Sequence, residues 1–301
     1  MFQHILVPLD GSPLAERALP FAQAIAAAGN TRLRLLRVVL PSVNHPDVEA
    51  AAVTEAEGYL RNLAKRLSPV TTDCVVEKGE ATDILLDLIT RPDIDLVAMS
   101  THGRSGIGRW IYGSVADAVL RHSPVPVLLA SASMQLTRWR SDRPLRILVS
   151  LDYSALSESI LEPACNLADT LKAKLILASV APLLVTPDPY GGVDVAYDPD
   201  EDRAERRIYL EGIAEKLRKP GRDVSIQDAF GQVDWTLLEV AREQGADLIA
   251  IASHGSGGVT RLIMGSVASS IVQRAPLPLL IVRPAVPSEE PDSSKGGETT
   301  G

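Results

Sequence analysis

The chain of 301 residues carries a formal net charge of −8, and 46% of its residues are hydrophobic. This length suggests about two domains, and an acidic balance with no visible basic stripe argues against nucleic-acid binding. No apolar run reaches the roughly 18 residues of a membrane-spanning helix, and the first predicted strand begins too close to Met1 for a signal peptide. Cys74 and Cys165 show no CxxC spacing. We therefore expect a cytoplasmic protein with buried, reduced thiols and no membrane partner.

Strands and helices alternate from the start of the chain. Apolar runs predict strands over 4–10, 32–39, 71–78, 94–100 and 125–130, and helical periodicity predicts helices over 14–28, 47–67 and 80–91 and from residue 114 onward. The order returns with strands at 146–152, 173–180, 222–229, 247–252 and 278–283 and helices at 157–170, 200–218, 233–244 and 265–274. This alternation predicts an α/β fold whose parallel sheet is covered by helices on both faces.

The chain contains two copies of one domain. IDLVAMSTHGRSGIGRWIYGSV matches ADLIAIASHGSGGVTRLIMGSV at an offset of 152 residues, whereas ILVPLDGS matches ILVSLDYS at an offset of 142. The ten extra residues of the second copy fall in a loop over 182–202 that is rich in Pro, Gly and Asp, and this loop could cover the second site or contact another chain. We predict a first domain over 1–132, a linker over 133–144, a second domain over 145–284 and a disordered tail over 285–301.

The fourth strand of each copy opens into a glycine-containing loop, and a helix begins at the end of that loop, at Ser114 or Ser266. Glycines let the backbone approach a ligand closely, and a helix start offers unpaired N–H groups and a positive dipole end, so such a loop suits phosphate. The spacing matches neither the P-loop nor the dinucleotide fingerprint, and a plain surface turn is the alternative. The repetition of the loop favours a ligand site.

Ligands of open parallel sheets bind beyond the carboxyl ends of the strands, where the strand order reverses. Asp10 and Asp152 follow the first strands and could either accept hydrogen bonds from a ribose or cap the next helix; the sequence leaves both interpretations open. His102 and His254 lack a nearby partner nucleophile, which favours a structural role. No HxxxH, HExxH or CxxC spacing supports a metal site made by protein side chains.

ILVPLDGS, the STHG loop followed after nine residues by Gly-Ser, and the closing PVPVLL together resemble the universal stress protein family. The resemblance covers essentially residues 1–284 and indicates a tandem member with two domains. It implies the adenine-nucleotide alpha-hydrolase-like fold, a five-stranded parallel sheet with strand order 3-2-1-4-5 in each copy. It also implies binding of ATP, or of ADP or AMP, with Mg²⁺ held through the nucleotide phosphates.

The resemblance assigns a set of nucleotide-binding residues to each copy. They are Pro8, Asp10, Val38, Met99, Ser100, Gly103, Gly113, Ser114 and Val115 in the first and Asp152, Val180, Ile251, Ala252, Gly255, Gly265, Ser266 and Val267 in the second. The aspartates would face the ribose, the valines of the second strands the adenine edge, and the Gly-Ser pairs the phosphates. Ser100 and Ala252 replace the first glycine of the family pattern and add a Cβ near the expected ribose. Ser150 replaces Pro8 in the second copy, so the first site matches the pattern more closely.

Three functions remain open on the sequence. The first is an ATP-binding regulatory protein of the stress response. The second is an enzyme, at most a slow ATPase, and this class is disfavoured because PLDGSP and SLDYSA lack the SGGxDS-type loop of related ATP pyrophosphatases. The third is a nucleotide-free interaction scaffold, which the missing first glycines favour.

The sequence gives some information about partners other than the nucleotide. The apolar runs around 125–130 and 276–284 would be edge strands, and exposed apolar edges must be paired or covered. The family resemblance implies that they pair as an intramolecular pseudo-dimer, with coverage by the linker and tail as the alternative. A homodimer of the whole chain is a further possibility.

Overall fold

The computed structural model describes residues 1–42, 44–102, 113–131, 134, 139, 142–182, 186–187, 193–194, 199–219, 221–254 and 264–284. The first half contains β1 (His4–Pro8), a 3-10 helix η1 (Ala15–Ala18), α1 (Leu19–Gly29), β2 (Arg32–Val39), α2 (Pro46–Leu67), β3 (Thr72–Lys78), α3 (Ala81–Ile89), β4 (Leu96–Ser100), α4 (Ser114–His122) and β5 (Val127–Ala130). The second half contains β6 (Arg146–Ser150), α5 (Ala155–Glu158), α6 (Leu161–Leu171), β7 (Lys174–Ala181), β8 (Thr186–Pro187), β9 (Val193–Asp194), α7 (Pro199–Leu217), β10 (Val224–Phe230), α8 (Val233–Glu243), β11 (Leu248–Ala252), α9 (Ser266–Arg274) and β12 (Leu279–Val282).

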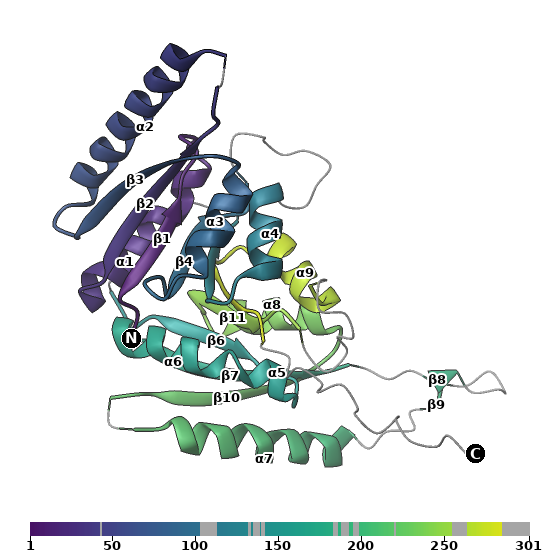
Figure 1. Cartoon of the computed structure of the whole chain (residues 1–301). Coiled ribbons are helices and arrows are strands. Elements are labelled where there is room, and N and C mark those ends of the chain that lie inside the picture. Colours follow the sequence, from purple (N-terminus) through teal and green to yellow (C-terminus); the bar gives the residue numbers. More distant parts are fainter. Residues whose placement is uncertain are drawn as a thin grey trace, which may run out of the picture.

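Both halves contribute to a single ten-stranded sheet with the order β10-β7-β6-β11-β12-β5-β4-β1-β2-β3 (Figure 1). The order 3-2-1-4-5 predicted for each copy is confirmed in both halves of the sheet. Within this sheet, the strand pairs of each half are parallel. The pair that joins the halves, β5 with β12, is antiparallel and places Leu128 opposite Leu280.

The antiparallel join fixes the directions of the two halves. Strands β1 to β5 run parallel to one another, and β12 runs against β5. The carboxyl ends of the first-half strands and those of the second-half strands therefore lie at opposite rims of the sheet. Since ligands of such sheets bind at carboxyl ends, the ends of β4 and β11, where the repeated loops begin, lie at different rims of the sheet.

Alternating side chains of the strands build two hydrophobic cores, one on each face of the sheet. One core packs α1, α2, α6 and α7 against residues such as Val7, Leu35 and Leu177. The other packs α3, α4, α8 and α9 against residues such as Leu6, Leu36 and Ile251. Each core contains buried residues of both copies, so the copies share their interior as well as their sheet.

The helices predicted over 14–28 and 157–170 are each divided in two. In the first copy η1 precedes α1, and Pro20 lies in the first turn of α1. In the second copy the short α5 precedes α6, whose first turn contains Pro163. Proline has no N–H to donate and a fixed φ, which suits a helix start and not a helix interior. A prediction of one continuous helix was therefore wrong at both places.

The loop predicted over 182–202 is also more structured than its composition suggested. Thr186–Pro187 and Val193–Asp194 pair as the antiparallel strands β8 and β9, and α7 begins at Pro199. The predicted tail over 285–301 lies outside the described residues.

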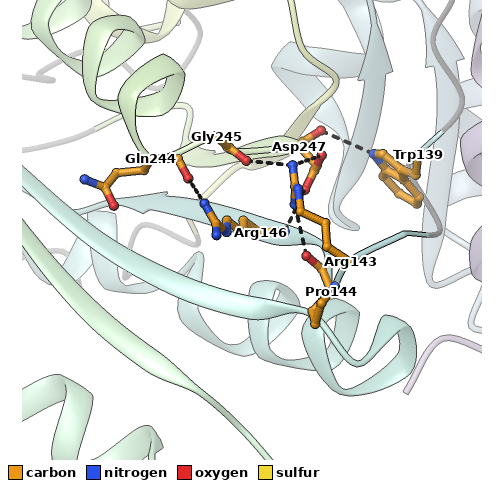
Figure 2. A network of polar contacts seen from close by, with 7 residues as sticks. All are labelled: Trp139, Arg143, Pro144, Arg146, Gln244, Gly245 and Asp247. Atoms are coloured by element: carbon orange, nitrogen blue, oxygen red, sulfur yellow. Dashed lines mark hydrogen bonds and ion pairs between the residues drawn. The ribbon is translucent and has the colours of Figure 1, made fainter.

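The end of the linker binds the second half through Asp247, the residue before β11 (Figure 2). Arg143 donates to both carboxylate oxygens of Asp247, at 2.7 and 2.9 Å, and Trp139 Nε1 donates to the Asp247 carbonyl at 3.2 Å. The Trp139 ring also packs on Phe21 of α1, with 5.1 Å between ring centroids. One tryptophan thus contacts both halves of the chain.

Asp247 has a counterpart in Asp95, which the repeat brings to the start of β4. Asp95 accepts hydrogen bonds from the backbone N–H groups of Gln3 and His4, and Asp247 accepts one from the N–H of Arg146. In both copies the aspartate therefore fastens the start of the fourth strand to the start of the first. This role explains why the residue recurs in both copies without belonging to either loop.

Candidate functional site

The second strand of each copy extends past the carboxyl end of the first strand. Backbone groups of the second strand therefore face the space beyond that end. Leu9 N donates to Leu36 O, while Gly79 N donates to Val39 O on the other side of β2. Because successive residues of a strand point their N–H and C=O groups to opposite sides, Val38 faces the same side as Leu36, beyond the end of β1. Leu151 N donates to Ala178 O in the same way, so Val180 is the equivalent position of β7.

Asp10 and Asp152 stand at the turn that follows the first strand. Asp10 Oδ1 accepts a hydrogen bond from Ser12 N at 2.9 Å, and Asp152 Oδ1 accepts from Ser154 N at 3.1 Å. In the second copy Ser154 caps the helix that follows, α5, because its Oγ accepts a hydrogen bond from Ser157 N. The aspartates therefore shape the turn without capping the helix directly, and both line the cavities described below.

The helices α4 and α9 begin without a side-chain cap. Gly113 and Gly265 occupy the N-cap positions, and a glycine has no side chain with which to cap the helix. The glycine N–H groups donate instead to the ends of the fourth strands, Gly113 N to Thr101 O and Gly265 N to Ser253 O. The N–H groups of a helix's first turn and the positive end of its dipole suit an anion.

These elements enclose one cavity in each half. The first has a volume of about 240 Å³ and its described lining is Pro8, Leu9, Asp10, Ala15, Leu36, Val38, Ala81, Leu85, Met99, Ser100, Thr101, His102, Gly113, Ser114, Val115 and Ala116. Every residue that the sequence assigned to the first site, apart from Gly103, lies on this wall. Gly103 lies outside the described residues.

The second cavity has a volume of about 420 Å³ and lies at the corresponding place in the second half. Its described lining is Ser150, Leu151, Asp152, Tyr153, Ser157, Ser179, Val180, Ala181, Pro182, Arg206, Val233, Ile251, Ala252, Ser253, His254, Gly265, Ser266, Val267, Ala268 and Ile271. All predicted residues of the second site are present except Gly255, which lies outside the described residues.

The histidines are held by the hydroxyl residue that precedes each of them. His102 Nδ1 lies 3.0 Å from Thr101 Oγ1, and His254 Nδ1 lies 2.9 Å from Ser253 Oγ. His102 Nε2 is buried and has no hydrogen-bond partner among the described residues. Sequence reasoning did not single out Thr101 and Ser253, although both are hydroxyl residues at the same place in the repeat.

No group of three or more His, Cys, Asp or Glu side chains among the described residues is arranged to hold a metal ion. None of the helices in the described ranges has the length and apolar content needed to cross a membrane.

The match to known proteins decides the family. A model of the universal stress protein family matches twice, over residues 1–131 and 145–283. The chain belongs to the universal stress protein family. It has the tandem form of the family, with two domains in one polypeptide.

Relatives of similar length support this assignment. A universal stress protein of Mycolicibacterium smegmatis is 27% identical over 300 residues, which span 93% of this chain and 97% of the relative. One from Mycobacterium tuberculosis is 25% identical over 302 residues, which span 93% and 96% of the two chains. The crystal structure of a universal stress protein from Archaeoglobus fulgidus is similar in fold, with a TM-score of 0.71, 21% identity, and coverage of 93% of this chain and 98% of that one.

Proposed function

We propose that this family member binds adenine nucleotide, with ATP as the main ligand, and regulates partners according to the occupancy of its two sites. The observation that carries the proposal is the convergence of the described candidate residues on two equivalent cavities at the points where the strand order reverses. ADP or AMP would use the same contacts with fewer phosphates.

Each part of the cavity suits one part of a nucleotide. The exposed N–H and C=O of Val38 or Val180 can bond the edge of a base, because a backbone position offers both a donor and an acceptor. Asp10 or Asp152 can accept hydrogen bonds from ribose hydroxyls, because a carboxylate oxygen has more than one lone pair and can accept a further bond beside that of the turn. The uncapped starts of α4 and α9 suit the phosphates, and Mg²⁺ would be held by those phosphates.

The join between the halves supports a second part of the proposal. The antiparallel pairing of β5 with β12 covers both edge strands within one chain. We therefore propose that the two halves act as an intramolecular pseudo-dimer. A nucleotide-free scaffold is the competing function, and the observation that favours it is the position of Ser100 and Ala252 on the cavity walls, where the family pattern has glycine.

Calorimetric titration of ATP with Mg²⁺ tests the proposal in the wild type and in two matched variants. Ser114→Asp and Ser266→Asp each place a negative charge at one helix start, where the carboxylate favours the helix and repels a phosphate. Both serines are exposed, so the fold should be retained. We expect about two ATP per chain in the wild type and the loss of one site in each variant.

Ala50→Asp is the control, because it adds the same charge to an exposed position of α2 away from both cavities. It should leave both sites intact. Absence of binding heat and of thermal stabilisation in the wild type at millimolar ATP would reject nucleotide binding and leave the scaffold function.

A further inference from the structure

The second cavity has an aromatic wall that the first lacks. Tyr153 is the one Phe, Tyr or Trp residue in its described lining, and the described lining of the first cavity includes none. The Tyr153 ring stacks on the ring of Tyr209 of α7, with 4.5 Å between ring centroids and 22° between ring planes. Tyr153 is nevertheless 45% exposed, so the stack covers only part of its surface. The remainder gives the cavity an aromatic surface.

The support for this ring is present in both copies, but the ring itself is not. The Tyr209 hydroxyl donates to Glu158 Oε1 at 3.0 Å, and Tyr59 of α2 donates in the same way to Glu16 at 3.1 Å. In the first copy the residue that follows the aspartate of the first turn is Gly11. The two copies therefore share the supporting tyrosine and differ in what lies in front of it.

Tyr153 adopts a backbone conformation that favours glycine. Its φ is +68°, close to the +82° of Gly11, so the second copy keeps the turn while carrying a large side chain. Asn30 and Lys172 are the other described non-glycine residues with positive φ, and each ends a helix, where this conformation is usual. Tyr153 lies in the turn after β6 and ends no helix. Left-handed backbone costs a non-glycine residue conformational energy, and such strain gathers at ligand sites.

The turn brings the ring to the part of the cavity where a base is expected. Val180 of β7 faces the space beyond the end of β6, and Asp152 and Tyr153 follow the end of that strand. The start of α9, which suits the phosphates, belongs to the helix layer on one face of the sheet, whereas α7 packs on the other face. Since Tyr153 stacks on α7, its ring lies on the side away from the phosphate site.

The chemistry of this wall suits a nucleobase. Every base has a π face and can stack on an aromatic side chain. Burial raises the pKa of the Tyr153 phenol above its usual value, so the ring is uncharged near pH 7 and does not repel an anionic ligand. The cavity volume of about 420 Å³ falls within the range of roughly 300–1,000 Å³ that is typical of small-molecule sites.

We propose that Tyr153 is the base-stacking residue of the second site, with the nucleobase lying on the exposed part of its ring while Tyr209 supports the ring from behind. The inference rests on the proposed nucleotide-binding function and extends it, because it gives the second site a contact for which the first has no equivalent in its described lining. The stabilisation belongs to the base of the ligand and not to its phosphates.

Titration of ADP into Ser114→Asp, which retains only the second site, tests the role of the ring. Adding Tyr153→Leu keeps an apolar side chain and removes the aromatic face, and it should weaken ADP at least about fivefold. Tyr153→Phe keeps the ring and should bind ADP within about twofold of the parent. Unchanged affinity in the leucine variant, or an equal loss in both variants, would overturn the proposal.

The matched control is Tyr153→Leu added to Ser266→Asp, which retains only the first site. ADP affinity should not change there, and because the two halves share one sheet, a loss at both sites would reveal a structural role of Tyr153 and reject the stacking role. Inorganic pyrophosphate, which has no base, is measured at the second site by competition with ADP. Its affinity should be the same with and without Tyr153→Leu.

Proton NMR of ADP tests the stacking without any substitution at residue 153. Protons held over the face of an aromatic ring resonate upfield, so H2 and H8 of adenine should move upfield on binding to Ser114→Asp and show no comparable shift with Ser266→Asp. Absence of the upfield shift at the second site overturns stacking and leaves nucleotide binding in place. Absence of ADP and ATP binding to the wild type rejects the function on which the inference rests.

Discussion

Ser100 is the last residue of β4, is 6% exposed, and lies on the wall of the first cavity. Its Oγ lies 3.5 Å from the backbone nitrogen of His102, so the side chain is held at the strand end. Ala252 occupies the same position in β11. Each side chain takes space at the place where a ribose is proposed to bind.

Replacing these two residues by glycine should strengthen nucleotide binding. We expect Ser100→Gly and Ala252→Gly each to raise the ATP affinity of their own site by up to about tenfold, since relieving an overpacked contact is worth on the order of 1 kcal/mol or more. Stability should fall slightly because glycine weakens a strand. Single-site titrations check the result, and an unchanged or lower affinity would show that neither Cβ obstructs the ligand.

Single residues also mark the limit of what the sequence predicts. Asp10, Val38 and Ser114 were found because they recur and because their positions at strand ends or helix starts follow from local patterns. Arg206 and Tyr153 were not found, since neither recurs in the first copy and the register of α7 over the sheet is set by tertiary packing. Comparing the two copies for residues that fail to repeat would have drawn attention to both.

At the scale of elements, α2 and α7 cover the two outer ends of the sheet (Figure 1). Each is tied to the helix after the first strand by a phenol, with Tyr59 donating to Glu16 at 3.1 Å and Tyr209 to Glu158 at 3.0 Å. Burial, followed by the charge of the glutamate, raises the pKa of Tyr59 well above its usual value of 10. Burial and Glu158 raise the pKa of Tyr209 in the same direction.

These two tyrosines should make the fold sensitive to alkaline pH. Above about pH 10 the unfolded chain releases the phenol protons while the folded chain retains them, so the free energy of unfolding falls as the pH rises. Below that pH both states hold the protons and the tyrosines add no pH dependence. Urea denaturation between about pH 8 and pH 11 measures the slope. Tyr59→Phe with Tyr209→Phe should flatten the slope, and an unchanged slope would assign it to other groups.

Some of the helices and strands differ from those that local sequence patterns predict. Strand and helix types were predicted correctly because each segment is short and strongly periodic. The breaks at Pro20 and Pro163 follow from local chemistry and could have been predicted. The pairing of β8 with β9 could not, because the loop that contains them has the composition of an irregular segment.

At the scale of the whole molecule, the two halves share one sheet and both hydrophobic cores. Leu128 of β5 and Leu280 of β12 face each other at the join, and they are 1% and 0% exposed. Trp139 contacts Phe21 on one side and Asp247 on the other. The two repeated sequences therefore share one sheet and the cores on both of its faces.

The chain should unfold in a single transition. We expect Leu280→Ala to lower the free energy of unfolding by about 2–5 kcal/mol and to shift the signals of both halves together. Urea denaturation followed by tryptophan fluorescence, in one variant that retains only Trp110 of the first copy and another that retains only Trp235 of the second, checks the coincidence. Two separate transitions, or a loss confined to the second half, would show that the halves are independent.

The opposed rims also determine how a partner could detect bound ligands. Because β12 runs against β5, the carboxyl ends of β4 and β11 lie at opposite rims, and a single flat partner surface on one rim would contact only one of the two cavities. Two separate partner molecules could each dock on one rim, or one partner would have to wrap around the sheet. Under the proposed function, the two sites would therefore be read separately, each at its own rim, and only a partner that contacts both rims would respond to the occupancy of both sites.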